Sequence, residues 1–165
     1  MTRPALVPVA LPPGALLKRY RDEGAYTDCY AADVAGSVDL AAFISAFYNS
    51  RAFRPERWLL GWAVKRPATA GDVAQLACGK SQRFSAWTVE ARTDDQLLLR
   101  DFQGRTRSWL MVKPVAGATR LHFGSAVVPG RTGGDRIVFR ALLGFHRLYS
   151  RILLGSAVKA LRRGA

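Results

Sequence analysis

The sequence predicts an α+β fold: a curved antiparallel β-sheet, a meander, packed against a long C-terminal helix, with two short helices after the first strand. Two observations support this prediction. Residues 84–128 divide into four segments rich in β-branched, aromatic and leucine residues, joined by very short connections. Residues 135–163 contain no proline and have helical periodicity. The total of 165 residues suits one domain.

The first strand is predicted for the segment AYTDCYAADV, residues 25–34. Its alternation puts Asp28 and Cys29 on opposite faces, so the two side chains cannot share one cavity. We interpret Cys29 as a buried, inert thiol, and we interpret Cys78, beside a glycine turn, in the same way.

Three helical segments follow the first strand. The run LAAFISAFYNS comes directly after Asp39, which suits the N-cap position. The run FRPERWLLGWAVKRP has a proline in its first turn and is stopped by Pro67. Residues 72–78 predict a short third helix that ends at Gly79, a common C-terminal position for glycine.

Five strands are expected in all, the first strand and four in the meander. The meander strands are predicted over Phe84 to Arg92, Gln96 to Phe102, Arg105 to Lys113, and Thr119 to Val128. The connections TDD, QG and PVAG are too short for a parallel crossover, which needs a dozen or more residues. We therefore expect sequential antiparallel pairing. On the last strand His122 falls on the polar face, where we expect it to be solvated.

The C-terminal helix has two distinct sides. At about 100° per residue, five arginines fall within roughly a quarter-turn, and four other side chains lie opposite them. The arginines are Arg136, Arg140, Arg147, Arg151 and Arg162; the opposite side holds Leu142, His146, Tyr149 and Leu153. We expect one basic edge and one face that covers the sheet.

Residues 1–24 predict an extended, proline-stiffened arm that lies on a single domain of residues 25–165. Pro8, Pro12 and Pro13 break the helix that a signal peptide would form here. The chain has two cysteines, which is too few for a disulfide framework and fits a reducing cytoplasm. The sequence thus favours a cytoplasmic protein.

The chain is strongly basic, with 25 Lys and Arg against 12 Asp and Glu and a formal charge of +13. Such a charge favours anionic partners. A nucleic-acid partner is not expected because no helix-turn-helix, zinc-finger or RNA-recognition signature is present. The five arginines of the C-terminal helix, together with Arg163, suit peripheral docking on an anionic membrane surface. The alternative is a solvated basic face.

Residues 25–163 contain, in this order, a strand, helices, an antiparallel meander and a long closing helix. The closing helix includes the segment FHRLYSRILL. This order resembles the START-like superfamily, also called helix-grip or SRPBCC, and is similar to bacterial members without an assigned activity. The resemblance rests on no catalytic motif, and the five expected strands are fewer than usual. It implies an apolar cavity between the sheet and the last helix, and binding or carriage of a hydrophobic small molecule or lipid.

Within such a cavity, the candidate ligand-binding residues lie on the last helix and the meander. They are His146, Tyr149, Leu142, Leu153, Trp87 and Trp109. His146 and Tyr149 are three residues apart, so they share a helix face, and both can form hydrogen bonds with a polar group. Core packing around the two tryptophans and buried polar tips on the helix are the alternative interpretation.

Two further functional classes remain open on the sequence. The same cavity suits a cyclase or dehydratase with His146 as general base and Tyr149 as hydrogen-bond donor. A domain that packs without a cavity would instead serve protein interactions. Two histidines, and no CxxC or HExxH spacing, indicate neither a metal site nor a cofactor.

Overall fold

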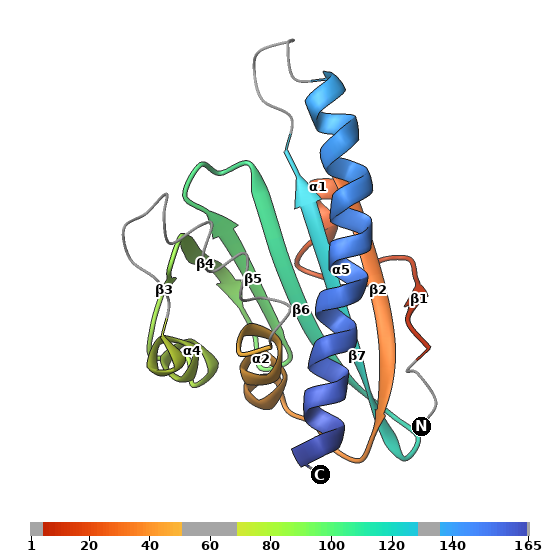
Figure 1. Cartoon of the computed structure of the whole chain (residues 1–165), viewed down its shortest axis with the longest axis vertical. Coiled ribbons are helices and arrows are strands. Elements are labelled where there is room, and N and C mark those ends of the chain that lie inside the picture. Colours follow the sequence, from red (N-terminus) through yellow and green to blue (C-terminus); the bar gives the residue numbers. More distant parts are fainter. Residues whose placement is uncertain (1–4, 51–68, 129–135, 165) are drawn as a thin grey trace.

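A computed structural model describes residues 5–50, 69–128 and 136–164. Within 136–164 it describes the side chains of residues 147–163. Figure 1 shows a single sheet crossed by a long C-terminal helix. The predicted α+β class, with a curved antiparallel sheet packed against that helix, is confirmed.

The sheet has seven antiparallel strands in the order β1-β2-β7-β6-β5-β4-β3. Strands β3 to β7 are neighbours in sequence and in space, as the short connections predict. The strands are β1 (Val7–Pro8), β2 (Tyr26–Ala35), β3 (Arg83–Phe84), β4 (Trp87–Arg92), β5 (Gln96–Asp101), β6 (Thr106–Val115) and β7 (Ala118–Val127).

Two of these strands were not expected. The segment predicted as one strand from Phe84 divides into β3 and β4 because Ser85 adopts a positive φ of 52°, which turns the chain between them. The other addition is β1, which the N-terminal arm places beside β2. The arm also contains a short helix, α1 (Lys18–Asp22), so it is extended only in part.

The helices α2 and α4 begin where the sequence provides side-chain caps. Asp39 accepts a hydrogen bond from the amide of Ala42 and caps α2 (Leu40–Tyr48), as predicted. Thr69 and Asp72 form a capping box for α4 (Ala70–Ala77). The predicted helix FRPERWLLGWAVKRP lies outside the described residues. The last helix, α5, runs over Arg136–Gly164.

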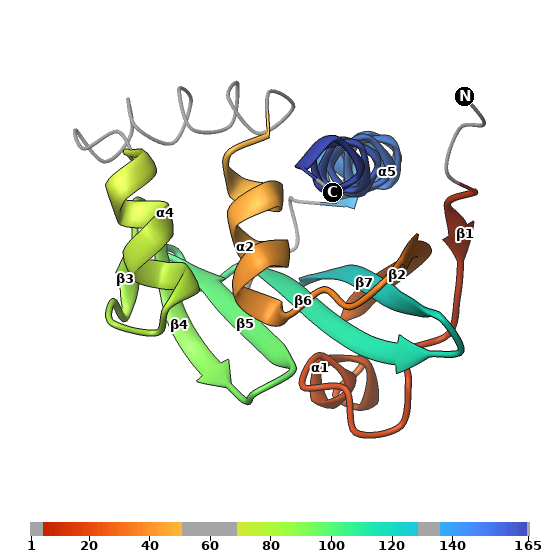
Figure 2. The same cartoon turned by 90° about the horizontal axis from the view of Figure 1, so that it is seen from below.

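The two faces of the sheet are covered by different parts of the chain (Figure 2). On one face lie α2, α4 and α5, and on the other lie α1 and the part of the N-terminal arm that follows β1. The helix-side core includes Phe43, Phe47, Leu99 and Phe123. The opposite core includes Leu17, Leu98 and Trp109. Both faces of the sheet are therefore buried, and a strand in it can be hydrophobic at every position. On β5, Leu97 and Leu99 point to the helix side and Leu98 to the opposite side, and all three are fully buried.

Candidate functional site

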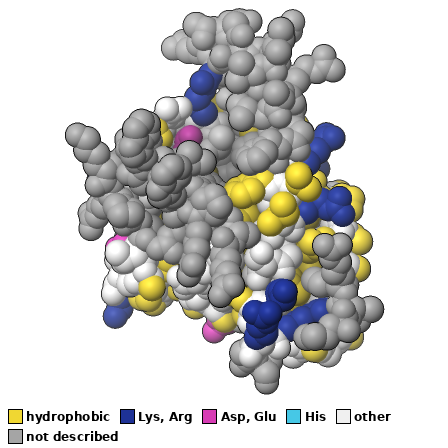
Figure 3. Space-filling model, in the orientation of Figure 1, with side chains coloured by type: hydrophobic (Ala, Val, Ile, Leu, Met, Phe, Trp, Pro, Cys, Tyr) yellow, Lys and Arg dark blue, Asp and Glu magenta, His cyan; other side chains and the backbone are white. Residues whose placement is uncertain are grey.

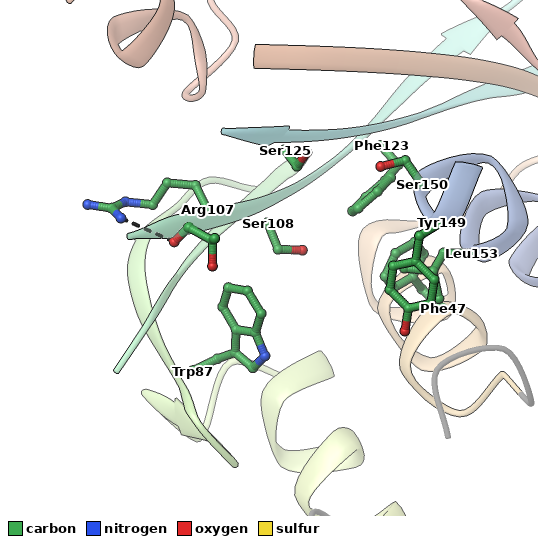
Figure 4. Close-up of a pocket in the computed structure, with 10 residues that line it drawn as sticks. Phe47, Trp87, Arg107, Ser108, Phe123, Ser125, Tyr149, Ser150 and Leu153 are labelled. Atoms are coloured by element: carbon green, nitrogen blue, oxygen red, sulfur yellow. Dashed lines mark hydrogen bonds between the residues drawn. The ribbon is translucent and has the colours of Figure 1, made fainter. Parts of the chain in front are cut away.

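A small pocket lies between the helix-side face of the sheet and the helices α2 and α5 (Figure 4). Strands β4, β6 and β7 form its floor. Its lining consists of Phe47, Trp87, Thr106, Arg107, Ser108, Phe123, Ser125, Tyr149, Ser150 and Leu153. Its position between the sheet and the last helix is the one that the sequence resemblance implies.

The pocket is partly open to solvent and mainly apolar, and its volume is about 30 Å³, measured as space for the centre of a water-sized sphere. A volume of at least about 10–15 Å³ on this measure holds one water molecule. Pockets for drug-sized ligands occupy about 300–1,000 Å³. In this conformation the pocket therefore has room for a water molecule or a small chemical group, and a larger ligand requires its walls to move apart.

Trp87 provides the least satisfied polar group in the pocket wall. Its side chain is 7% exposed, and its indole Nε1 has no hydrogen-bond partner among the residues that the structure describes. In Figure 4 the nitrogen edge of the ring faces the side of the pocket where Phe47 and Tyr149 lie. A buried donor without a partner costs about 1–3 kcal/mol. An acceptor group placed in the pocket would recover this cost.

A row of small polar side chains crosses the sheet at the pocket. Ser108 on β6 lies opposite Ser125 on β7, which lies opposite Asp28 on β2. Ser125 donates to Asp28 Oδ1 from its hydroxyl at 2.7 Å and from its amide at 2.9 Å. On α5, Ser150 Oγ lies 3.4 Å from Asp28 Oδ2. The Asp28 carboxylate thus joins β2, β7 and α5 beside the pocket.

At the other end of this row, Ser108 Oγ lies 3.2 Å from the phenol oxygen of Tyr48, the last residue of α2. Either oxygen can donate to the other. Both side chains are buried, at 8% and 1% exposure. The pocket therefore combines apolar rings and Leu153 with hydroxyl groups and one indole N–H, a lining suited to a mainly apolar ligand that has one or two polar atoms.

Three of the predicted ligand-binding residues meet in this pocket: Trp87, Tyr149 and Leu153. Leu153 is buried and Tyr149 is half-buried. The backbones of Leu142 and His146 belong to α5, but their side chains lie outside the described residues. The predicted neighbourhood of His146 and Tyr149 therefore stays a prediction.

Trp109 does not line the pocket, because it faces the other side of the sheet. It lies opposite Leu98 on β5 and Gly124 on β7, and paired residues point to the same face. Its ring belongs to the core beneath α1, where its Nε1 donates to Gln96 Oε1 at 3.0 Å. The alternation of side chains along each strand was predicted correctly. The sequence could not show whether Trp87 on β4 and Trp109 on β6 share a face of the sheet, because that depends on the register of the strands.

His122 also differs from the expectation. It is 4% exposed instead of solvated, and within the described part of the chain its Nδ1 has no hydrogen-bond partner. The ring lies 6.2 Å from that of Trp109, on the face that the N-terminal segment covers. Burial, followed by the positive charges of Arg120 and Lys113, lowers the pKa of His122 to about 4.

The two cysteines behave differently from each other. Cys29 is buried in the core beneath α1, as predicted, and burial together with the Asp28 charge raises its pKa to about 12. A thiol in this state is protonated and a poor nucleophile. Cys78 is exposed, contrary to the prediction, because it follows α4 at its C-terminal end, and its Sγ contacts the carbonyl of Gln75.

The predicted basic edge is exposed where the structure describes it. Arg147, Arg151 and Arg162 are all exposed on α5, and Arg147 Nε donates to the phenol oxygen of Tyr26 at 3.0 Å. The side chains of Arg136 and Arg140 lie outside the described residues.

The pocket contains residues that the sequence did not identify, chiefly Ser108, Ser125 and Ser150. Ser108 alternates with Trp109, so the sequence predicts that the two side chains lie on opposite faces of β6. Its place in the pocket depends on the register between β6 and β7, which puts Ser108 opposite Ser125, seventeen residues later. Ser150 follows Tyr149 on α5 and reaches Asp28 more than 100 residues earlier in the chain. Such separations leave no local pattern.

Among the described residues, no group of three or more His, Cys, Asp or Glu side chains lies close enough together to hold a metal ion. In the same part of the chain, no helix has the length and apolar character needed to cross a bilayer.

Comparison with known proteins gave no match: no family model, curated protein or solved structure is significantly similar to this chain.

Proposed function

We propose that the chain binds a small, mainly apolar molecule in the pocket between the sheet and α5, as a reduced member of the START-like superfamily. This proposal rests on the buried N–H of Trp87, which has no hydrogen-bond partner among the described residues and lies in a mainly apolar pocket. The ligand therefore has a hydrogen-bond acceptor, such as a carbonyl oxygen, at the end that enters the pocket.

The order of the elements supports the superfamily proposal. A strand, helices, an antiparallel meander and a long terminal helix follow one another along the chain, and the pocket lies between the sheet and that helix. The described pocket holds only the acceptor end of the ligand. The apolar remainder then extends through the open side of the pocket.

Binding without catalysis is the better supported form of this proposal. Cys29 lies on the other face of the sheet with a raised pKa, so it supplies no nucleophile to the pocket. The cyclase or dehydratase alternative requires His146 as a base at the pocket, and it predicts that His146→Ala abolishes turnover of the bound compound. We further propose a cytoplasmic location, because Cys29 and Cys78 are both free thiols.

A second candidate function is a tightly packed interaction domain without a ligand. The pocket volume of about 30 Å³ favours this candidate, because it is far below the range of small-molecule sites.

Nuclear magnetic resonance of the indole N–H groups distinguishes the two. The Trp87 signal is identified by its loss in a Trp87→Phe variant, and the probe is a short-chain aliphatic ketone titrated into the full chain. Ligand binding predicts a saturable shift of the Trp87 signal. Trp109 provides an internal control, because its N–H is bonded to Gln96 on the opposite face.

Equal small shifts of both indole signals, or none, would contradict the pocket proposal. Native mass spectrometry of gently purified protein gives an independent measurement. A co-purified apolar compound that is lost in the Trp87→Phe variant supports the carrier function, whereas a clean apo mass supports the interaction domain.

A further inference from the structure

The outer face of α5 is a basic surface with an apolar centre. It turns away from the pocket, so it is separate from the proposed ligand site. We call it the docking face and define it by exposed side chains from the second half of the helix: Leu148, Arg151, Ile152, Lys159, Arg162 and Arg163.

Helical geometry puts these side chains in one stripe. At about 100° per residue, all six fall within about 120° around the helix, with Leu148 near the middle. The opposite side of α5, including Leu153, Leu154 and Ala157, is buried against the rest of the protein. From Leu148 to Arg163 the stripe is about 22 Å long at about 1.5 Å per residue.

The apolar centre is unusually exposed. Leu148 is 59% and Ile152 47% exposed, and they are two of the four large hydrophobic side chains that stand out in the described part of the chain. Because they are four residues apart, they are neighbours on one helix face.

The charge around this centre has one sign. Residues 136–164 contain no Asp or Glu. Figure 3 shows hydrophobic side chains beside Lys and Arg side chains over α5, with the acidic side chains in view lying away from them. Apolar side chains among arginines and lysines, on a helix that lies flat on the surface, match a helix that binds at the headgroup region of an anionic membrane.

We propose that the docking face binds the protein peripherally to anionic phospholipid membranes, with Leu148 and Ile152 entering the headgroup region and the surrounding arginines and lysine contacting lipid phosphates. Arginine suits this role because its planar guanidinium forms two parallel hydrogen bonds with a phosphate group. The six side chains lie along one side of α5, so they face a flat surface together.

Vesicle co-sedimentation with the full chain tests the proposal. The vesicles contain phosphatidylcholine alone, or phosphatidylcholine mixed with phosphatidylglycerol. We expect binding to the mixed vesicles at low ionic strength and its loss at about 1 M salt, where charges are screened beyond about 3 Å. Binding that is equal on both vesicle types would overturn the proposal.

Two sets of variants separate charge from apolar contact. Arg151→Gln with Lys159→Gln and Arg163→Gln should weaken binding on the order of 100-fold, because each basic residue near the surface changes affinity about fivefold. Leu148→Ser with Ile152→Ser should also weaken binding. The matched controls are Lys80→Gln with Arg100→Gln and Lys113→Gln for charge, and Phe102→Ser for the apolar pair, since all four side chains are exposed away from α5.

Equal binding by the docking-face variants and the controls would overturn the proposal. So would self-association of the wild-type chain, measured by light scattering, that Leu148→Ser with Ile152→Ser abolishes while vesicle binding is absent. The Trp87→Phe variant should bind vesicles as well as the wild type does. Failure of the pocket proposal and failure of membrane docking are therefore seen in separate measurements.

Discussion

Arg107 on β6 binds Tyr20 of α1 in two ways at once. Its Nε donates to the phenol oxygen at 2.7 Å, and its guanidinium carbon lies 4.5 Å from the centre of the ring. Glu90 on β4 accepts from Tyr20 and forms an ion pair with Arg107 at 2.8 Å. Arg19 also pairs with Glu90. This cluster fixes α1 on the face of the sheet opposite the pocket.

Removal of the Arg107 side chain should destabilise the fold strongly. Arg107 is 8% exposed, and in the described part of the chain Arg107→Leu leaves the exposed Arg19 as the one ionic partner of Glu90. Breaking a buried pair by removing one member costs about 3–5 kcal/mol, and we expect about 3 kcal/mol less stability in urea unfolding. Tyr20→Phe, which loses hydrogen bonds but keeps the ring, should cost about 1 kcal/mol.

The matched control for Arg107 is an exposed ion pair in the same sheet. Arg120 makes two hydrogen bonds to Asp33, at 2.7 and 2.9 Å, and both side chains are 46% exposed. Arg120→Leu should cost much less than Arg107→Leu, because water competes for exposed pairs. Equal losses for Arg107→Leu and Arg120→Leu would show that burial of the first pair contributes nothing.

Acid should destabilise the protein through His122. Its pKa is about 4 in the folded chain, against an ordinary value of 6.5, so between these pH values the unfolded chain binds a proton that the folded chain does not. The free energy of unfolding should therefore fall by about 2 kcal/mol between about pH 7 and pH 4.5.

Urea unfolding across this pH range measures the effect, with His122→Leu as the comparison. The variant lacks the titrating ring, so the dependence of its stability on pH should be flatter. Asp33 contributes little here, because its hydrogen bond from Arg120 lowers its pKa below the usual carboxyl value of 3.8. An unchanged pH dependence in His122→Leu would assign the acid sensitivity to other groups.

Much of the fold could be predicted because its signals are local. The short connections between residues 84 and 128 required antiparallel neighbours, and Asp39 preceded an apolar periodic run. Burial of one side of α5 followed in the same way from helical periodicity. The division at Ser85 was not predicted, because a positive φ at a serine has no compositional signal as clear as glycine.

The candidate site was predicted only in part, because its remaining groups meet through register. Asp28 and Ser125 are 97 residues apart and become neighbours only when β2 pairs with β7. The burial of His122 and Trp109 depends on the N-terminal arm, which covers a face that an alternating strand would otherwise expose to solvent. Helix periodicity placed Tyr149 and Leu153 on the side opposite the arginines, whereas an inward position for Trp87 was one of two alternatives that the sequence left open.

The two thiols should differ sharply in reactivity. At neutral pH the buried Cys29 is protonated, with a pKa of about 12, while Cys78 is exposed. Iodoacetamide should therefore modify Cys78 in the native protein and Cys29 only after unfolding in urea. Peptide mass spectrometry locates the label, and Cys78→Ser should abolish the native reaction. Rapid native labelling of Cys29 would contradict its burial.

Gly124 lies where the opposite core, the one beneath α1, has no room for a side chain. A β-carbon there would lie 2.7 Å from the carbonyl oxygen of Asp28, 2.9 Å from Leu17 and 3.0 Å from the ring of Trp109. The first of these atoms belongs to the backbone of β2, the neighbouring strand, so it cannot move without disturbing the strand pairing.

Gly124→Ala should therefore lower stability by about 1–3 kcal/mol, the usual cost of overpacking. Gly71→Ala is the matched control. Gly71 lies in α4, and the nearest atom to its new β-carbon is Thr69 Oγ1 at an ordinary 3.5 Å. Since alanine favours helix over glycine by up to about 1 kcal/mol, Gly71→Ala should raise stability. Urea unfolding of both variants tests the opposite signs, and a neutral Gly124→Ala would show that Leu17 and the backbone of Asp28 can move apart at no cost.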